Sequence, residues 1–326
     1  MTVIFWIGFI VIIGGLLALD LGVFHKEDAE PSARSALRWT LVWATLALIF
    51  TGFVYGAYSH HWFGIGLAAD GHVATRGGEA ALQYLTGYLI EYTLSMDNIF
   101  VIALIFGFFQ IPPRFQHRVL FWGIMGAIVM RGVMILAGAA LVTRFSWIMY
   151  VFGAFLIFTA IKMLFSGDEK VDPEHSWVIK LTKKFFPVTH ELDGNHFFTK
   201  LESGKWAATP LLLALVFIEN TDLLFAVDSI PAIFAITTDP FIVFTSNIFA
   251  IMGLRSLYFA LQAMLNRFHL LKYSLVFILA YVGVKMLIVY FGIHIPALAS
   301  LGVIAAALGA GVLASLWATR DQASAI

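Results

Sequence analysis

The sequence contains no cysteine, which excludes disulfide bonds, thiolate metal sites and cysteine nucleophiles together. It also contains little charge, because only 12% of its residues are Asp, Glu, Lys or Arg, whereas soluble globular proteins carry roughly 25%. The twenty basic residues balance the twenty acidic ones, so the chain has no general electrostatic attraction to nucleic acid. These shortages exclude an ordinary soluble domain, whose surface needs more charge than this chain has.

Apolar residues are abundant: 60% of the chain is hydrophobic, and the mean hydropathy is +0.88. A helix that spans a bilayer needs about 20 mostly apolar residues. Nine stretches meet this requirement, at 3–23, 37–58, 80–109, 118–142, 147–165, 207–238, 241–264, 273–291 and 298–317. The first has no basic leader and no small-residue cleavage site, so we expect a retained helix rather than a signal peptide. The sequence therefore predicts an all-α polytopic membrane protein with about nine transmembrane helices.

The distribution of basic residues predicts the orientation. The loops after spans one, three, five and seven, with the C-terminal tail, hold thirteen Lys and Arg residues, and the opposite side holds only Arg76 and Arg144. By the positive-inside rule, the N-terminus lies outside and the C-terminus is cytoplasmic, in the inner (plasma) membrane of the cell. The one long polar segment, 166–206, is then a cytoplasmic loop. It contains a short amphipathic run at 177–186, and we favour a solvated linker over a regulatory element.

Charged residues inside the spans are the most informative feature. A charge at the centre of a bilayer costs on the order of 2.5–3.5 kcal/mol even on mild insertion scales. The in-span acids are Glu91, Asp97, Glu219, Asp222 and Asp228, and the in-span bases are Arg131, Lys162, Arg255 and Lys285. Buried ion pairs that only hold helices together are one explanation. Because all five acids lie in the third and sixth spans, we favour a compensated interior site that the bases neutralise when it is empty.

The charges recur in the same order in two regions of the chain. Each region has a pair of acids six residues apart, an arginine in the next span, and a lysine in the span after that. The two series are Glu91, Asp97, Arg131, Lys162 and Asp222, Asp228, Arg255, Lys285. The spacing predicts two three-helix units, 80–165 and 207–291, joined by the 166–206 loop. Two further spans precede them in 1–58, and one span with a short tail follows in 298–326.

Three spans per unit means that the two units cross the membrane in opposite senses. Inverted repeats with charges near the midplane are typical of secondary transporters. Both acid-bearing stretches are longer than a straight crossing, and Pro231 disfavours helical geometry at the residue before it. We therefore expect a break at the centre of the sixth span, and a weaker tendency to break in the third. The carboxylates of Asp97 and Asp228 are expected to approach each other near the midplane.

Oxygen is the ligand atom that these helices offer. The candidate metal ligands are Glu91, Asp97, Asn98, Glu219, Asp222, Asp228 and Ser229. No histidine lies at the centre of a span, and an all-oxygen set suits hard cations such as Mn²⁺, Mg²⁺ or Ca²⁺. Surplus carboxylates could also carry protons, because protonation would offset the metal charge on the return step.

Two long motifs, 91–98 and 225–232, resemble those of the TerC family of integral membrane proteins, and the stretches 18–22 and 195–198 also match. The resemblance covers nearly the whole chain and is strongest to the Alx branch, whose members are implicated in Mn²⁺ export. It implies that the five in-span acids are metal-site candidates. It also implies that the cation is Mn²⁺ above all and that the direction is export. Together with the repeats and the surplus carboxylates, this predicts a secondary transporter that exports a divalent cation in exchange for protons and needs no resident cofactor. The expected partners are the ion, protons and the bilayer, without nucleic acid.

Several alternatives stay open. The same acids could serve an exchanger for Ca²⁺ or another cation, because selectivity depends on cavity size and ligand count. A non-transporting stress-response or sensor component of the tellurite-resistance type is another possibility. Catalysis is disfavoured, since the Gly-x-Gly-Asp pattern of intramembrane aspartyl proteases is absent around Asp97 and Asp228. The chain also lacks the Gly-x₄-Gly-Lys-Ser/Thr loop of an ATP-driven pump. We therefore expect no enzyme activity, and the sequence leaves the oligomeric state open.

Overall fold

The structure is a computed structural model, and it describes residues 3–22, 33–67, 73–145, 147–165, 177–189, 191–201, 204–262 and 270–323. The side chains at the outer ends of a few helices, and that of Asp97, lie outside this description. The elements in chain order are α1 (Val3–Gly22), α2 (Ala33–Ser59), η1 (Trp62–Gly64), α3 (Gly77–Phe108), α4 (Pro113–Arg144), α5 (Ile148–Phe165), α6 (Trp177–Phe185), β1 (Phe198–Lys200), β2 (Trp206–Ala208), α7 (Pro210–Phe234), α8 (Pro240–Gln262), α9 (Leu271–Ile288), η3 (Val289–Phe291) and α10 (Ala297–Ala323). The predicted all-α class is confirmed.

Eight of these helices are long and apolar enough to cross a membrane: α2, α3, α4, α5, α7, α8, α9 and α10. Each begins and ends within a few residues of the stretch predicted for it. The first predicted span forms α1, a 20-residue helix. The segment of α1 with fully described side chains, Trp6–Leu17, is a shorter apolar helix. The chain is thus a multi-pass membrane protein, and a ninth crossing by α1 stays a prediction.

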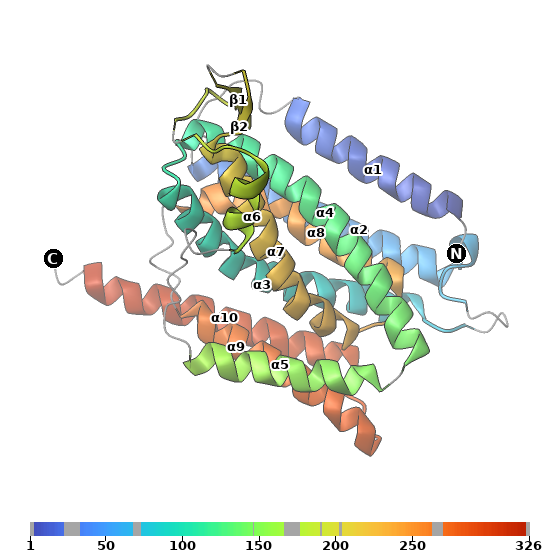
Figure 1. The fold of residues 1–326 in the computed structure, drawn as a ribbon. Helices are drawn as coiled ribbons and strands as arrows, with labels where there is room; N and C mark the ends of the chain where they lie inside the picture. Colours follow the sequence, from blue (N-terminus) through green and yellow to red (C-terminus); the bar gives the residue numbers. More distant parts are fainter. Residues whose placement is uncertain are drawn as a thin grey trace.

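The helices pack as a bundle around α3, α4, α7 and α8, with α1 and α2 on one side and α5, α9 and α10 on the other (Figure 1). The main contacts join the two predicted units: α3 packs on α8, α4 on α7, and α5 on α9. Glycines let α5 and α9 approach closely, since a Cβ atom on Gly283 would lie 2.8 Å from the carbonyl oxygen of Gly153. Exchanging the two units would turn the α3–α8 contact into the α7–α4 contact. This reciprocal packing is what a two-fold relation would produce, although the inverted repeat itself stays a prediction.

The prediction of a helix break in the sixth span is wrong. Both α3 and α7 are continuous helices, and α7 runs through Pro231 to Phe234. Pro231 lies in the last turn of α7, where its missing N–H removes a single helical bond. The polar residues just before Pro231 contact other helices, because Asp228 accepts from Thr159 on α5 and Ser229 accepts from Arg131 on α4.

The polar segment between the two units is partly folded. Helix α6 packs on α7, and β1 pairs antiparallel with β2, with Phe198 opposite Ala208 and Lys200 opposite Trp206. The hydroxyl of Thr209, at the start of α7, donates to the carbonyl oxygen of His196, 2.8 Å away. The predicted amphipathic run is therefore a helix held against the bundle. Its role as a linker or as a regulatory element stays a prediction.

Candidate functional site

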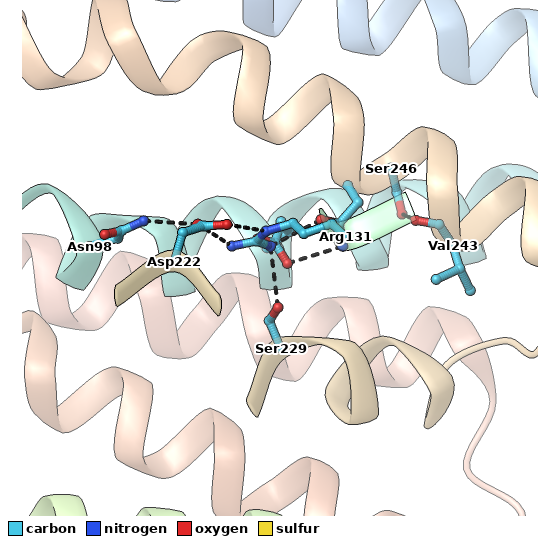
Figure 2. A network of polar contacts seen from close by, with 8 residues as sticks. Asn98, Arg131, Asp222, Ser229, Val243 and Ser246 are labelled. Atoms are coloured by element: carbon cyan, nitrogen blue, oxygen red, sulfur yellow. Dashed lines mark hydrogen bonds and ion pairs between the residues drawn. The ribbon is translucent and has the colours of Figure 1, made fainter. Parts of the chain in front are cut away.

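Arg131 lies at the centre of a buried polar network in the middle of the bundle (Figure 2). It reaches from α4 to acids on two other helices, Glu91 of α3 and Asp222 of α7. Its Nε and Nη2 atoms donate to the two carboxylate oxygens of Asp222 over 3.1 and 2.8 Å, a bidentate pair. Its Nη1 atom forms the ion pair with Glu91. The three side chains are 0–4% exposed, so a buried ion triad joins α3, α4 and α7.

Three neutral side chains complete the network. Asn98 Nδ2 donates to Asp222 Oδ1 over 3.1 Å, and Asn247 Nδ2 donates to Glu91 Oε2 over 3.2 Å. The oxygens of Asn247 and Ser229 accept from Arg131 Nη1, at 3.0 and 3.3 Å. Each charged group therefore has hydrogen-bond partners besides its ion pair, as a buried charge requires.

The charges of this network do not balance. Two carboxylates face one guanidinium, which leaves one negative charge in a buried position. A further acid, Glu219, lies one turn before Asp222 on α7. With every group ionised, this excess would favour a further cation or a proton at the centre of the bundle, because an uncompensated charge is costly away from water.

The network connects the two predicted units reciprocally. Asn98 directly follows the second acid of the first unit, and it binds Asp222, the first acid of the second unit. Ser229 directly follows the second acid of the second unit, and it accepts from Arg131, the partner of Glu91 in the first unit. The first acids of both units thus meet at one guanidinium, beside the polar residues that end the two motifs.

Glu219 and Asn98 present oxygens that have no partner. Glu219 Oε2 and Asn98 Oδ1 are buried and form no hydrogen bond with any described residue. The Glu219 carboxylate lies against Gly126 of α4, where any larger side chain would clash with it. Asn98 and Asp222 also border a small cavity of about 20 Å³ between α3, α4, α7 and α8. That volume is enough for one water molecule, so the site has space and free acceptor oxygens next to its excess negative charge.

Asp228 is in a different environment. It is half-buried and turned towards α5, where Thr159 Oγ1 donates to its Oδ1 over 3.0 Å. The charge of Lys162, also on α5, acts on the same carboxylate. Asp228 therefore does not join the Arg131 network, although it lies only six residues from Asp222.

Three of the four in-span bases are buried, and each has a different set of partners. Arg131 is paired with both first acids, although its single charge balances only one of them. Arg255 is buried and donates from Nη1 to Nε2 of His117, 3.0 Å away. Lys285 is also buried and donates to Ser300 Oγ on α10 over 2.9 Å.

Four of the seven predicted ligands lie together in the structure, namely Glu91, Asn98, Asp222 and Ser229. Glu219 lies beside them and Asp228 faces α5. The side chain of Asp97 falls outside the description, so its approach to Asp228 stays a prediction. Among the residues that the structure describes, no three acidic or histidine side chains are close enough together to form a metal-ligand cluster. An arginine instead occupies the space between the first two acids.

Sequence reasoning missed Asn247, which binds both Glu91 and Arg131. A signal was available, since Thr245, Ser246 and Asn247 form a polar run inside an otherwise apolar span. It also missed Thr159 and His117, whose types are common in helices and whose spacing matches no motif.

Comparison with known proteins identifies the family. The profile of the Integral membrane protein TerC family matches residues 76–323. An uncharacterized membrane protein of Myxococcus xanthus is 47% identical over 97% of this chain and 92% of its own length. The Alx protein of Escherichia coli (strain K12), described by its name as a candidate membrane-bound redox modulator, is 42% identical over 97% of this chain and 95% of its own. No solved structure matches the chain. With eight apolar helices and a match that spans all of α3 to α10, this chain belongs to the TerC family of integral membrane proteins.

Proposed function

We propose that this protein is a secondary transporter that exports a divalent metal cation, Mn²⁺ first of all, from the cytoplasm. The supporting observation is the surplus of buried carboxylates over cations at Arg131. Two acids share one guanidinium, and Glu219 adds a third carboxylate nearby. Such a surplus of carboxylates leaves room for a further cation or for protons at this place.

The donor atoms favour a hard cation. Carboxylate, amide and hydroxyl oxygens surround the position of the guanidinium, and no histidine lies in the network. Such a set suits Mn²⁺, Mg²⁺ and Ca²⁺ better than soft metals. Among these three cations, the resemblance to the Alx branch favours Mn²⁺. The same resemblance favours export as the direction of transport.

In this proposal the guanidinium of Arg131 occupies the position that the metal ion takes when it binds. A divalent cation that binds Glu91 and Asp222 must displace it, since both carboxylates already point at Arg131. Asn98 then supplies an unpartnered oxygen at the small cavity, and Glu219 supplies another beside Gly126 of α4. Protons that bind the surplus carboxylates would restore the charge balance after release, which makes H⁺ the proposed coupling ion. We further propose an inner-membrane location, with the N-terminus outside.

A redox role, suggested by the name of the Alx relatives, is the alternative. This chain cannot carry out a thiol-based reaction itself, because its sequence contains no cysteine. In our proposal a redox effect would be indirect, through a metal ion whose concentration the protein controls.

Mn²⁺ flux into everted membrane vesicles tests the proposal. We expect vesicles with the wild-type protein to accumulate Mn²⁺, and vesicles with Glu219→Gln to lose most of the uptake. This variant removes a charge without removing any hydrogen bond to Oε2. Glu79→Gln is the matched control, because Glu79 is an exposed acid in the first turn of α3. A wild-type protein that moves no divalent cation would refute transport and favour a sensor role.

A further inference from the structure

Helix α6, in the polar segment between the two units, exposes a row of large apolar side chains. Trp177, Leu181 and Phe185 follow one another at intervals of four residues, so they lie along one side of the helix. They are 67%, 45% and 71% exposed. We call these three residues the α6 stripe. A contiguous exposed apolar surface is typical of a protein or membrane binding site, so the stripe calls for a partner.

The other side of α6 is packed against the bundle. Ile179 lies nearly opposite Leu181 around the helix, is 2% exposed and belongs to the same packed cluster as Leu211 of α7. Directly after α6, the ring of Phe186 contacts that of Phe198 on β1, with 5.3 Å between the ring centroids. These contacts fix the rotation of α6, and the stripe is the side that they turn outwards.

Lysines border the stripe. Lys180 and Lys184 lie in the row next to it, three residues after Trp177 and Leu181, and Lys183 lies farther round the helix. All three lysines are exposed, and α6 contains no acid. A basic helix with Trp, Leu and Phe on one face binds the surface of an anionic bilayer. The apolar face enters the boundary between headgroups and acyl chains, while the lysines extend to the phosphates.

The position of α6 also fits a membrane surface. The helix packs beside the start of α7 (Figure 1). With 25 residues, α7 is about 37 Å long, whereas the hydrocarbon core of a bilayer is about 30 Å thick. The start of α7, and α6 with it, therefore lies near the headgroups. The positive-inside rule predicts that this side is cytoplasmic, where the leaflet carries anionic lipids.

We infer that α6 is an interfacial helix that binds anionic lipid headgroups through the α6 stripe and its three lysines. A second copy of the chain is the other candidate partner. Two α6 helices placed face to face would bring their lysines together, and such like-charge contacts oppose association. The inference goes beyond the proposed transport function and does not depend on it.

Spin labelling of the full-length protein tests the inference. The chain has no cysteine, so one introduced cysteine carries the label. Leu181→Cys and Phe185→Cys report on the stripe, and Glu191→Cys, at an exposed acid after α6, is the control. In nanodiscs that contain phosphatidylglycerol, we expect the stripe labels to be more accessible to oxygen, which concentrates in lipid, than to a water-soluble nickel chelate. The label at Glu191 should show the reverse order.

Substitution of the lysines tests the lipid chemistry. Each lysine near an anionic surface strengthens binding about five-fold, so Lys180→Gln/Lys184→Gln should lower the ratio of lipid-bound to water-exposed stripe label by about 30-fold. Arg76→Gln/Arg144→Gln removes the same charge from exposed bases just before α3 and in the last turn of α4. This matched pair should leave the ratio unchanged.

Stripe labels as accessible to the nickel chelate as the Glu191 label would overturn the inference. Shielding that is equal in nanodiscs of phosphatidylcholine alone and in those with phosphatidylglycerol would also overturn it. Dipolar coupling between the labels of two chains would then identify a second copy as the partner. The presence or absence of Mn²⁺ flux decides the transport proposal and leaves this result unaffected.

Discussion

The acids of α7 lie in two contrasting environments only six residues apart. Asp222 is 4% exposed and is bound by a bidentate arginine and an asparagine. Asp228 is half-buried and is bound by the hydroxyl of Thr159, with Lys162 on the same side. Asp222 is thus paired with a charged guanidinium inside the bundle, whereas Asp228 accepts from a neutral hydroxyl at the edge of the bundle. In our account Asp222 therefore marks the position where the metal ion binds. Asp228 can exchange the hydroxyl of Thr159 for another partner.

Removal of both first acids has the largest expected effect. In Glu91→Gln/Asp222→Asn, Arg131 keeps its neutral partners but loses both counter-charges. An unpaired buried charge costs about 3–5 kcal/mol, so we expect little folded protein in the membrane, measured by detergent extraction and size-exclusion chromatography. Normal accumulation of this double variant would contradict the role of the acids in neutralising Arg131.

Asp222→Asn alone separates stability from function. This variant leaves one acid, Glu91, for one arginine, so the charge of the network becomes balanced. We expect a protein at least as stable as the wild type, with Mn²⁺ flux reduced to the level of empty vesicles. The unfolding temperature and the vesicle flux are measured on the same preparations. Strong destabilisation together with retained flux would reverse our assignment of roles.

Asp228→Asn tests the other side of the comparison. Asparagine keeps an oxygen that can accept from Thr159 but removes the charge. We expect the protein to accumulate normally and cells to gain intracellular Mn²⁺ and lose protection at high external Mn²⁺. Asp97→Asn, the equivalent change in the first unit, should behave in the same way. Wild-type protection in both variants would show that these two acids are structural.

Thr159→Val has the smallest expected effect. It removes one hydrogen bond to a half-buried carboxylate, worth about 1 kcal/mol, and changes no charge. We expect a small fall in unfolding temperature and a flux within a few-fold of the wild type. A loss of flux as large as that of Asp228→Asn would mean that the position of the carboxylate, rather than its charge, is critical.

The sequence predicted the helices better than the contacts among them. Apolar length and basic loops located the eight spans, because lipid imposes these requirements on any helix. The break at Pro231 was mispredicted, since a proline in the last turn costs the helix little and the nearby polar groups serve tertiary contacts.

For the site, charge counting placed Glu91, Asp222 and Arg131 in one compensated interior site, because unpaired charges are too costly in lipid. It did not single out these three from the other in-span acids and bases as direct partners. It could not separate Asp228 from Asp222, since the face that each residue presents depends on the rotation of α7 within the bundle. Asn247 stands in a polar run of its span, but the partners of Asn247 and of His117 became visible only when the packing of α3, α4 and α8 was known.

The most direct test of the central claim is an anomalous-scattering experiment on crystals grown with Mn²⁺. Our account predicts a single peak between α3 and α7, at the carboxylates of Glu91 and Asp222, with the Arg131 guanidinium displaced from both. The same crystals of Asp222→Asn should show no peak. Arg131 still bound to both carboxylates at saturating Mn²⁺, with no peak in the bundle, would contradict the account.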